Sequence, residues 1–332
     1  MRAWLSTAIG PPEQVLALGE RPAPEPVAGE LRVDVRAAAV GLPDLFMCRG
    51  AYEFKPRHPF TPGQEVAGVV NDASQAPGFE TGQRVMGVTA FYRGFGGFAE
   101  QAVLVADASW PVPDAMTDVE AAGFGIPFRT AFLGLVTRAG LRAGETLLVH
   151  GAAGGTGFAA VQLGRALGAR VIAVASGEDK CDFCRELGAD EVINRKREDF
   201  VEGVKARTGG RGSDVVFDPV GGQTFLRSLD CMATQGRLLA IGFASGSWAD
   251  APTAKLVPNN LSVLGVIAVP PSAEIAEEMR LRLMEYYAAG TIRPQVADTI
   301  DFERLPEALA ALEAQRVSGK QVLVIARADH GR

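Results

Sequence analysis

A glycine-rich turn in the segment TLLVHGAAGGTG constrains this chain more than any other feature. The apolar run 147–149 suits a buried parallel strand, and residues 158–167 show helical periodicity. Between them, Gly151, Gly154 and Gly157 recur at three-residue spacing. A pyrophosphate can approach bare backbone there, where the N–H groups of a helix N-terminus carry positive partial charge. The pattern predicts a dinucleotide-binding turn, although glycine clusters also serve simply to turn a chain.

The length and charge of the chain limit its class. With 332 residues it exceeds the usual single core, so two domains are expected. An apolar content of 47% with dispersed glycine and proline is typical of an α/β protein. A net charge of -6, without basic runs interleaved with aromatics, argues against a nucleic-acid partner. No run of eighteen apolar residues occurs, so we expect no membrane span and a cytoplasmic protein.

The four cysteines are scattered along the chain, which favours reduced thiols in the cytosol. Cys181 and Cys184 form a CxxC, a spacing found in zinc sites. The surrounding EDKCDFCRELG has a helical pattern and no second CxxC follows it, so we expect helix packing and no metal.

After the glycine turn, short apolar runs alternate with helical patterns of about ten residues. This alternation predicts a parallel sheet covered on both faces and wound right-handedly, a Rossmann domain over residues 122–266. The strands expected after the first are 170–176, 191–194, 214–218, 237–243 and 261–267, and the helices between them are 178–187, 197–207 and 223–232.

The residues ahead of this domain have a different pattern, with clustered prolines, turn glycines and alternating strands. A β-rich domain is therefore expected there. The apolar run 320–326 has no place in the six-stranded sheet, so the tail should return to the first domain. The other expected elements are strands 31–40, 65–70 and 84–88 and helices 274–290 and 305–315.

Four stretches together resemble the medium-chain dehydrogenase/reductase superfamily, specifically its zinc-independent quinone oxidoreductase branch. They are VGLPDLFMCRGAY (40–52), PGQEVAGVV (62–70), VHGAAGGTGFAAVQLGRALGARVIAVAS (149–176) and DVVFDPVGG (214–222). The resemblance implies an α/β protein with a GroES-like β-barrel catalytic domain, residues 1–121 and 267–332, around the Rossmann domain. Members of this branch are usually oligomers, so a homodimer is expected, and the apolar edge 261–269 is a candidate for pairing across a two-fold axis.

The zinc-dependent relatives hold their metal with an early cysteine, a histidine in a GHE motif and a third ligand. This chain has Gly63-Gln64-Glu65 at the motif and no cysteine around Val40 and Gly41. Alcohol–ketone interconversion would lack its Lewis acid. A quinone or an alkene conjugated to a carbonyl accepts hydride without one, because hydrogen-bond donors can stabilise its oxygen.

The end of the second Rossmann strand predicts the cofactor. Ser176 can bond a 2′-phosphate without repelling it, and Lys180 follows at a spacing that could reach the same group, as the family uses them. Glu178 or Asp179 would take the NAD role if either turned inward, but beside a lysine they favour helix capping. Arg195 is either a second cation near the phosphate or solvent-facing. We expect NADPH.

The resemblance also supplies the remaining cofactor contacts. The glycine turn should follow the pyrophosphate through Gly154, Gly155, Thr156 and Gly157. Asp218 ends a strand where open sheets build sites, or only caps its turn. The other expected contacts are Thr130, Gly242, Phe243, Val266, Ile267, Ala268 and Lys320.

The catalytic chemistry is less well specified. Tyr52 aligns with a tyrosine that relatives place over the nicotinamide, and its phenol can donate to a substrate oxygen or stack on a ring; otherwise it is a packed barrel aromatic. Asp44 is a helix N-cap or an orienting group. Gly41 departs from the family pattern, in which an asparagine often contributes to the substrate oxygen site, and this puts substrate choice in doubt. Arg129 is a second departure: its cation either pairs with a cofactor phosphate, receives a carboxylate or thioester substrate, or crosses the domain interface.

Three functions follow. The main expectation is an NADPH-dependent quinone or enone reductase, with a proton from Tyr52 or water. An enoyl thioester reductase is the alternative, with a phosphate-binding rim of Arg49, Lys55, Arg57 and Arg93. A non-catalytic NADPH-binding protein is the third.

Overall fold

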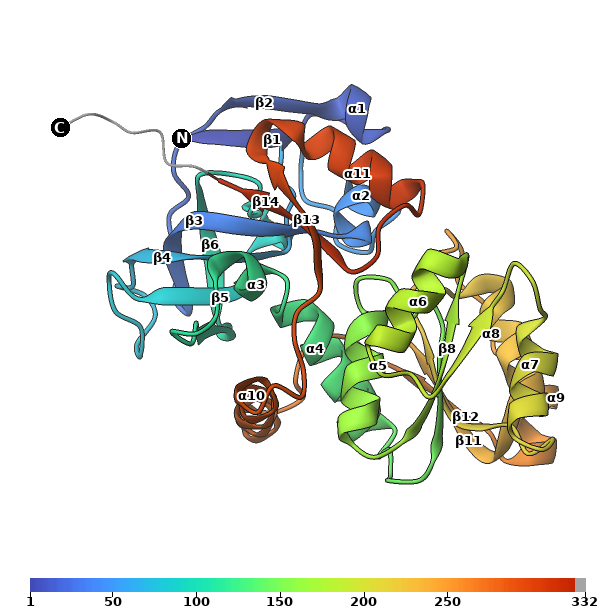
Figure 1. Cartoon of the computed structure of the whole chain (residues 1–332). Helices are drawn as coiled ribbons and strands as arrows, with labels where there is room; N and C mark the ends of the chain where they lie inside the picture. The colour runs from blue at the N-terminus through green and yellow to red at the C-terminus, as the bar shows by residue number, and fades with distance from the viewer. Residues whose placement is uncertain (326–332) are drawn as a thin grey trace. The chain divides into compact units, whose positions relative to one another are not determined.

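The computed structural model describes residues 1–325, and the chain forms two compact units. The first unit combines Met1–Gly125 with the segment from Pro294 onward, and the second comprises Ile126–Arg293. Each unit has its own six-stranded sheet (Figure 1).

The sheet of the second unit is parallel throughout, in the order β12-β11-β10-β7-β8-β9. Chain order reverses beside β7, and ligands of such sheets bind outside the carboxyl ends of the strands at this point. The predicted Rossmann-type sheet is confirmed. Its strands are β7 (Thr146–Val149), β8 (Arg170–Ala175), β9 (Glu191–Asn194), β10 (Ser213–Asp218), β11 (Met232–Ala240) and β12 (Ser262–Gly265).

Helices surround this sheet, so its central strands are apolar at almost every position. All four residues of β7 are buried, as are five of the six in β8. Cys181 and Cys184 are buried in α6. The helical elements are α4 (Gly125–Phe132), the π-helix η2 (Leu133–Arg138), α5 (Gly157–Ala166), α6 (Glu178–Glu186), α7 (Phe200–Arg207), α8 (Gly222–Ser228), the 3-10 helix η3 (Leu229–Cys231), α9 (Thr253–Leu256), the 3-10 helix η4 (Val257–Asn259) and α10 (Ala273–Ala288).

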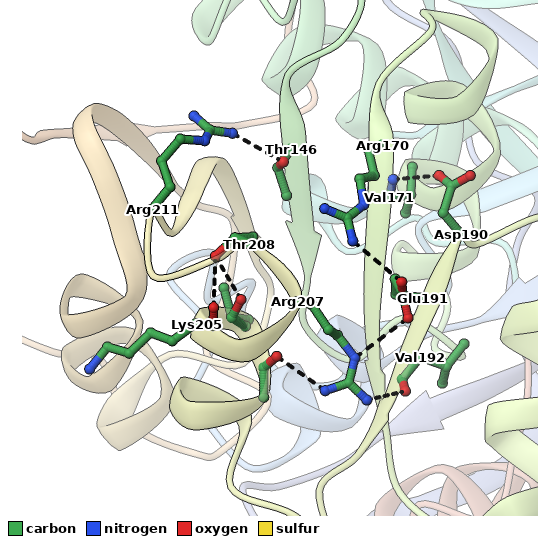
Figure 2. Close-up of polar contacts among 12 residues, drawn as sticks. Thr146, Arg170, Val171, Asp190, Glu191, Val192, Lys205, Arg207, Thr208 and Arg211 are labelled. Carbon is green, nitrogen blue, oxygen red and sulfur yellow. Dashed lines mark hydrogen bonds and ion pairs between the residues drawn. The ribbon is translucent and has the colours of Figure 1, made fainter.

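Charged side chains hold the amino ends of the strands in this unit (Figure 2). Arg170 and Arg207 both reach Glu191, with N–O distances of 3.3 and 3.6 Å. Arg211 donates to the Thr146 hydroxyl at 3.2 Å. The opposite, carboxyl ends of β7 and β10 run into glycine-rich turns, which are suited to approach by a ligand.

The first unit is built on an antiparallel barrel. Strand β3 (Glu30–Val40) pairs with β4 (Glu65–Asp72), β4 with β5 (Arg84–Thr89), β5 with β6 (Gln101–Pro111), and β6 returns to β3. Its core includes buried Leu31, Val33, Val66 and Leu104. The GroES-like barrel is confirmed. The remaining strands are β1 (Arg2–Ser6), β2 (Leu16–Glu20), β13 (Val296–Asp301) and β14 (Lys320–Val324).

The C-terminal segment completes this sheet, as expected. Strand β14 pairs antiparallel with β3, placing Val322 opposite Ala39, and β13 runs parallel to β14. The predicted strand extends to residue 326, which lies outside the described residues. The helical elements of this unit are α1 (Pro12–Val15), α2 (Leu42–Cys48), the 3-10 helix η1 (Phe91–Arg93), α3 (Asp118–Ala122), the 3-10 helix η5 (Phe302–Arg304) and α11 (Leu305–Glu313).

The boundaries between the units differ from those predicted. Residues 122–125 belong to the first unit, and residues 267–293, assigned to the first domain from the sequence, cluster with the second. Helix α10 explains the second difference, because the guanidinium of Arg282 lies 5.2 Å from the Phe132 ring centroid. Arg293 lies just beyond this helix, and its backbone exchanges two hydrogen bonds, of 2.8 and 2.9 Å, with the side chain of Gln162 in α5.

Strand β11 also differs from its predicted span of 237–243. It begins at Met232, which pairs with Ser213, so the predicted helix 223–232 ends early. It ends at Ala240 because the following loop turns toward β10, where Ala244 N–H donates to Pro219 O at 3.0 Å. Between Met1 and Ile325, no helix is both long and apolar enough to cross a membrane.

Candidate functional site

The turn between β7 and α5 has room for glycine alone at two positions. Gly151 has φ +54°, in the left-handed region. A Cβ on Gly157 would lie 2.2 Å from the Gly151 carbonyl oxygen. Helix α5 starts at Gly157, and its N-cap Thr156 makes no side-chain capping bond. Because the first turn of a helix has unpaired N–H groups, this end can bind an anion.

Three cations gather at the carboxyl ends of β8 and β9. The pKa of the half-buried Lys180 ammonium is lowered by burial and by the neighbouring charges of Arg195 and Lys196. The Lys196 ammonium lies 4.0 Å from the position that a Cβ on Gly177 would occupy. The repulsion among these cations would be relieved by a bound anion. Ser176, in the same turn, is partly exposed.

Glu178, the acidic residue nearest to this turn, interacts with Asn194 and Arg197. Glu178 Oε1 accepts a hydrogen bond from the Asn194 amide at 2.8 Å and pairs with Arg197 at 2.9 Å. Asn194 Oδ1 in turn accepts from Gly177 N–H at 3.1 Å. Asp179 is exposed at the start of α6. The carboxylate of Glu178 thus braces the turn.

The loops after β10 and β11 are joined to each other. Asp218 Oδ1 accepts from Val220 N–H at 2.8 Å and Gly221 N–H at 3.1 Å, so this carboxylate caps its turn. Burial raises the pKa of Asp218 to about 6. A Cβ on Gly221 would lie 3.0 Å from the Gly242 carbonyl oxygen. This close approach of the two loops explains the glycine at 221.

Aromatic rings follow β11. The Phe243 ring stacks at a tilt on Trp248, with centroids 4.6 Å apart, and Trp248 is 62% exposed. Val266 N–H donates to Ala240 O at 3.0 Å, which holds Val266 beside the end of β11. Ile267, which follows it, is 61% exposed.

Helix α4 holds two further residues singled out from the sequence. Thr130 is buried, and its hydroxyl donates to Ile126 O at 2.7 Å, one turn earlier in the helix. Arg129 is also buried, with 2% of its surface exposed. This low exposure shows that Arg129 is not a solvent-facing cation. Burial of an arginine is costly unless its charge is compensated.

In the first unit, the carboxylate of Asp44 is buried and caps two turns of the backbone. Its carboxylate accepts from Gly41 N–H at 2.9 Å and Gly63 N–H at 3.0 Å. Burial raises the pKa of Asp44 to about 7, although these hydrogen bonds and the charge of Lys320 oppose the shift. Tyr52 is partly buried, and burial raises its phenol pKa against the effect of a hydrogen bond from Gln64.

Lys320 lies in the same unit as Asp44. Its ammonium forms an ion pair of 2.6 Å with Glu65, and the two side chains are 8% and 5% exposed. A Cβ on Gly41 would lie 3.5 Å from Asp44 Oδ2 and 3.8 Å from Lys320 Nζ, so the three groups are close neighbours. Within the described part of the chain, no group of three His, Cys, Asp or Glu side chains could hold a metal ion.

The predicted residues thus fall into two sets, Asp44, Tyr52 and Lys320 in the first unit and the other predicted contacts in the second. Three neighbours were missed from the sequence. Lys196 had a signal, because it follows the strand 191–194 and so lies at the carboxyl edge. Trp248 stood out as an aromatic in a glycine–serine loop. No sequence signal pointed to Glu65, because its partner Lys320 is distant in the sequence.

Comparisons with known proteins agree with both units. The family model described as "Alcohol dehydrogenase GroES-like domain" matches residues 27–114, and the one described as "Zinc-binding dehydrogenase" matches residues 155–283. A quinone oxidoreductase-like protein 2 homolog from Nematostella vectensis is 34% identical over 300 residues, 89% of this chain and 81% of that protein. The Rattus norvegicus quinone oxidoreductase-like protein 2 is 33% identical, over 91% of this chain and 87% of its own length.

Solved structures give the same assignment. Escherichia coli quinone oxidoreductase complexed with NADPH has a TM-score of 0.90 at 28% identity, covering 98% of this chain and 100% of that one. The quinone oxidoreductase of Thermus thermophilus, also solved with NADPH, has a TM-score of 0.84 at 34% identity, with 98% and 100% covered. This chain therefore belongs to the medium-chain dehydrogenase/reductase superfamily, in its quinone oxidoreductase branch.

Proposed function

We propose that this chain is an NADPH-dependent reductase that acts on a quinone or an α,β-unsaturated carbonyl compound without zinc. The observation that carries this proposal is the group of cations formed by Lys180, Arg195 and Lys196 beside Gly177. A 2′-phosphate is the feature that separates NADPH from NADH, and it requires positive charge at this place. The engagement of Glu178 with Asn194 and Arg197 supports NADPH as well, because an acid for the ribose hydroxyls is turned elsewhere.

The residues of the second unit fit the rest of this cofactor. Gly154, Gly155, Thr156 and Gly157 form a cradle at the N-terminus of α5. This cradle is tight, because a Cβ at position 157 would collide with the backbone of Gly151 and Ala152. When bound, NADPH supplies the hydride. The cation group would hold its phosphate together with Ser176. The contacts proposed for the nicotinamide half are Thr130, Gly242, Phe243, Val266, Ile267 and Ala268.

Lys320 has two competing roles. The family likeness proposes it as a cofactor contact, whereas its buried ion pair with Glu65 favours a role in holding β14 against β4. Because the Lys320 ammonium already pairs with the Glu65 carboxylate at 2.6 Å, it attracts a second anion less strongly.

Zinc independence rests on the donor set. Gln64 stands where zinc-dependent relatives have a histidine, and glycine occupies position 41. An amide is a poor zinc ligand, and glycine has no side chain to contribute. Stabilisation of the developing oxyanion therefore falls to hydrogen-bond donors.

Tyr52 is the proposed donor in the first unit. A phenol of ordinary pKa 10 is already protonated near neutral pH, and burial raises the pKa of Tyr52 further, so this group can donate to an acceptor oxygen. The proton then comes from this phenol or from water. Asp44 contributes by holding the backbone of Gly41 and Gly63, as a positioning residue.

The enoyl thioester alternative loses part of its support. Two of the four cations proposed as a phosphate rim are already paired, Arg49 with Glu313 at 2.6 Å and Arg93 with Glu30. Lys55 and Arg57 are exposed, as surface cations commonly are. The non-catalytic alternative predicts cofactor binding without turnover.

One assay separates these functions. NADPH consumption is measured with a benzoquinone, an enone and an enoyl thioester, after exhaustive chelation. Turnover of the first two supports the proposal. Preference for the thioester would favour the alternative reductase, absence of turnover the non-catalytic protein, and activity that requires added zinc would contradict metal independence.

We also propose a cytoplasmic homodimer that pairs through the edge strand β12. This strand ends its sheet, and Ile267 and Val269, which follow it, are 61% and 63% exposed. An unpaired, apolar edge can join its copy across a two-fold axis. Sedimentation of the wild type and of Val263→Pro, a change that removes one β12 N–H, tests the pairing.

A further inference from the structure

A row of four aromatic rings leads from Tyr52 to exposed positions of the first unit. Tyr52 and Phe54 have ring centroids 6.1 Å apart, Phe54 and Phe91 5.6 Å, and Phe91 and Tyr92 5.8 Å. The last two pairs are edge-to-face. Such spacing is typical of favourable aromatic contact, so the rings form one connected surface.

The row has a rigid base. Phe91 is 8% exposed and packs in a core cluster with Met47 and Phe60. The segment that contains Phe54 is held against η1, because a Cβ on Gly94 would lie 3.2 Å from Phe60 and 3.7 Å from Pro56. The two segments that supply the rings therefore lie against each other.

The outer rings, in contrast, are left open. Phe54 is 40% exposed and Tyr92 is 44% exposed. Neither ring belongs to the core cluster, and contiguous exposed apolar surface marks a binding site more often than singly scattered apolar residues do. Arg93, the next residue after Tyr92, is neutralised by Glu30, so this cation does not make the end of the row an anion site.

We propose that this row binds an apolar substituent of the reducible substrate, extending away from the ring held at Tyr52. The inference rests on the proposed function and deepens it. A single-ring acceptor would contact only the Tyr52 end, whereas a hydrocarbon side chain on that ring would also cover Phe54 and Tyr92. Preferred substrates would then be quinones with a long apolar side chain.

The test compares two quinones that share one reacting ring. The probes are a 2,3-dimethoxy-5-methyl benzoquinone and its 6-decyl derivative, and dissociation constants are measured by calorimetry without cofactor. The wild type should bind the decyl compound roughly tenfold or more tightly, since burial of several methylene groups is favourable. This advantage should fall toward onefold in the double variant Phe54→Ala/Tyr92→Ala.

A control variant separates this row from general attraction of the decyl chain to apolar surface. Leu18→Ala removes a side chain of similar exposure, 38%, from β2 of the same unit. It should keep the wild-type advantage for the decyl compound. Phe54→Leu, which retains apolar area, should keep part of it, and circular dichroism verifies that each variant is folded.

The outcomes are distinct from those of the proposed function. An equal decyl advantage in the wild type and the double variant, or none in the wild type, would overturn the inference. Oxidation of NADPH by the parent quinone is followed separately. Its absence would contradict the reductase assignment, while binding of the two quinones would still decide whether the aromatic row recognises the apolar chain.

Discussion

The ammonium of Lys320 lies 2.6 Å from a carboxylate oxygen of Glu65, and both side chains are almost completely buried. The pair joins β14 to β4, strands from opposite ends of the chain. Lys320→Met should cost about 3–5 kcal/mol of unfolding free energy, because it removes one partner of a buried ion pair. Urea unfolding measures the loss.

The control for this variant is an exposed pair in the second unit. Lys255 and Asp230 are 2.7 Å apart but 46% and 45% exposed, so Lys255→Met should cost no more than about 1 kcal/mol. Equal costs in the two variants would contradict a stabilising role for the buried pair. If Lys320→Met remains folded, an unchanged NADPH affinity would exclude Lys320 as a cofactor contact.

Two substitutions at Tyr52 distinguish a role in proton donation from a role in stacking on the substrate. If its phenol donates to the developing oxyanion, Tyr52→Phe should lower kcat by roughly ten- to a thousandfold with little change in NADPH affinity. If Tyr52 only stacks, the phenylalanine variant should keep kcat while Tyr52→Ala raises KM. Steady-state kinetics on a quinone and an enone compare both variants. Unchanged kinetics in Tyr52→Ala would place this residue outside the site.

Asp44 should give the first unit a pH-dependent stability. Its pKa is about 7 in the folded chain, against 3.8 for an ordinary aspartate, so folding favours the protonated form. That stabilisation is present below about pH 4 and is lost as pH rises through about 7. Asp44→Asn, which cannot ionise, should therefore show a smaller decline in unfolding free energy between pH 4 and 8.

The matched control is Asp107→Asn, at an exposed position of β6. It should decline with pH as the wild type does. Chemical unfolding at four pH values in this range gives the comparison. An Asp44→Asn variant with the full wild-type decline would show that this carboxyl ionises without cost in the folded chain.

Gly157 tests the cradle itself. In Gly157→Ala the new methyl group would meet Gly151 O at 2.2 Å and Ala152 Cα at 2.7 Å, both backbone atoms. The backbone of the turn must then move. We expect the unfolding free energy to fall by roughly 1–3 kcal/mol, and cofactor binding to be lost as well. Gly265→Ala is the control, because nothing lies within 4 Å of its added Cβ. Calorimetry with NADPH would contradict the account if both variants bind normally.

The sequence predicted the Rossmann unit well because its signals are local. Alternating apolar runs and helical patterns lie in order along the chain, and parallel pairing follows from their connection. The start of β11 was missed because Gln235, with φ +63°, and Gly236 interrupt its apolar pattern. Short strands with such irregularities give little periodicity to detect.

The candidate site could be predicted only in part. Ser176 and Lys180 follow directly from a strand end, and Lys196 follows from the next one. The partners of Asp44 and Lys320 come from distant strands, and no local pattern specifies them. The row from Tyr52 to Tyr92 joins two loops of the barrel, and loop packing is decided by tertiary contacts.

The most direct test of the account is the affinity for the two nicotinamide cofactors, measured by calorimetry in the wild type and in Lys180→Ala. The wild type should bind NADPH more tightly than NADH. The variant should lose roughly 1–3 kcal/mol toward NADPH, for a charge-assisted hydrogen bond, and little toward NADH. Lys205→Ala, which removes an exposed ammonium 3.5 Å from Glu202, should change neither affinity. Equal losses for both cofactors in Lys180→Ala, or tighter NADH binding by the wild type, would contradict it.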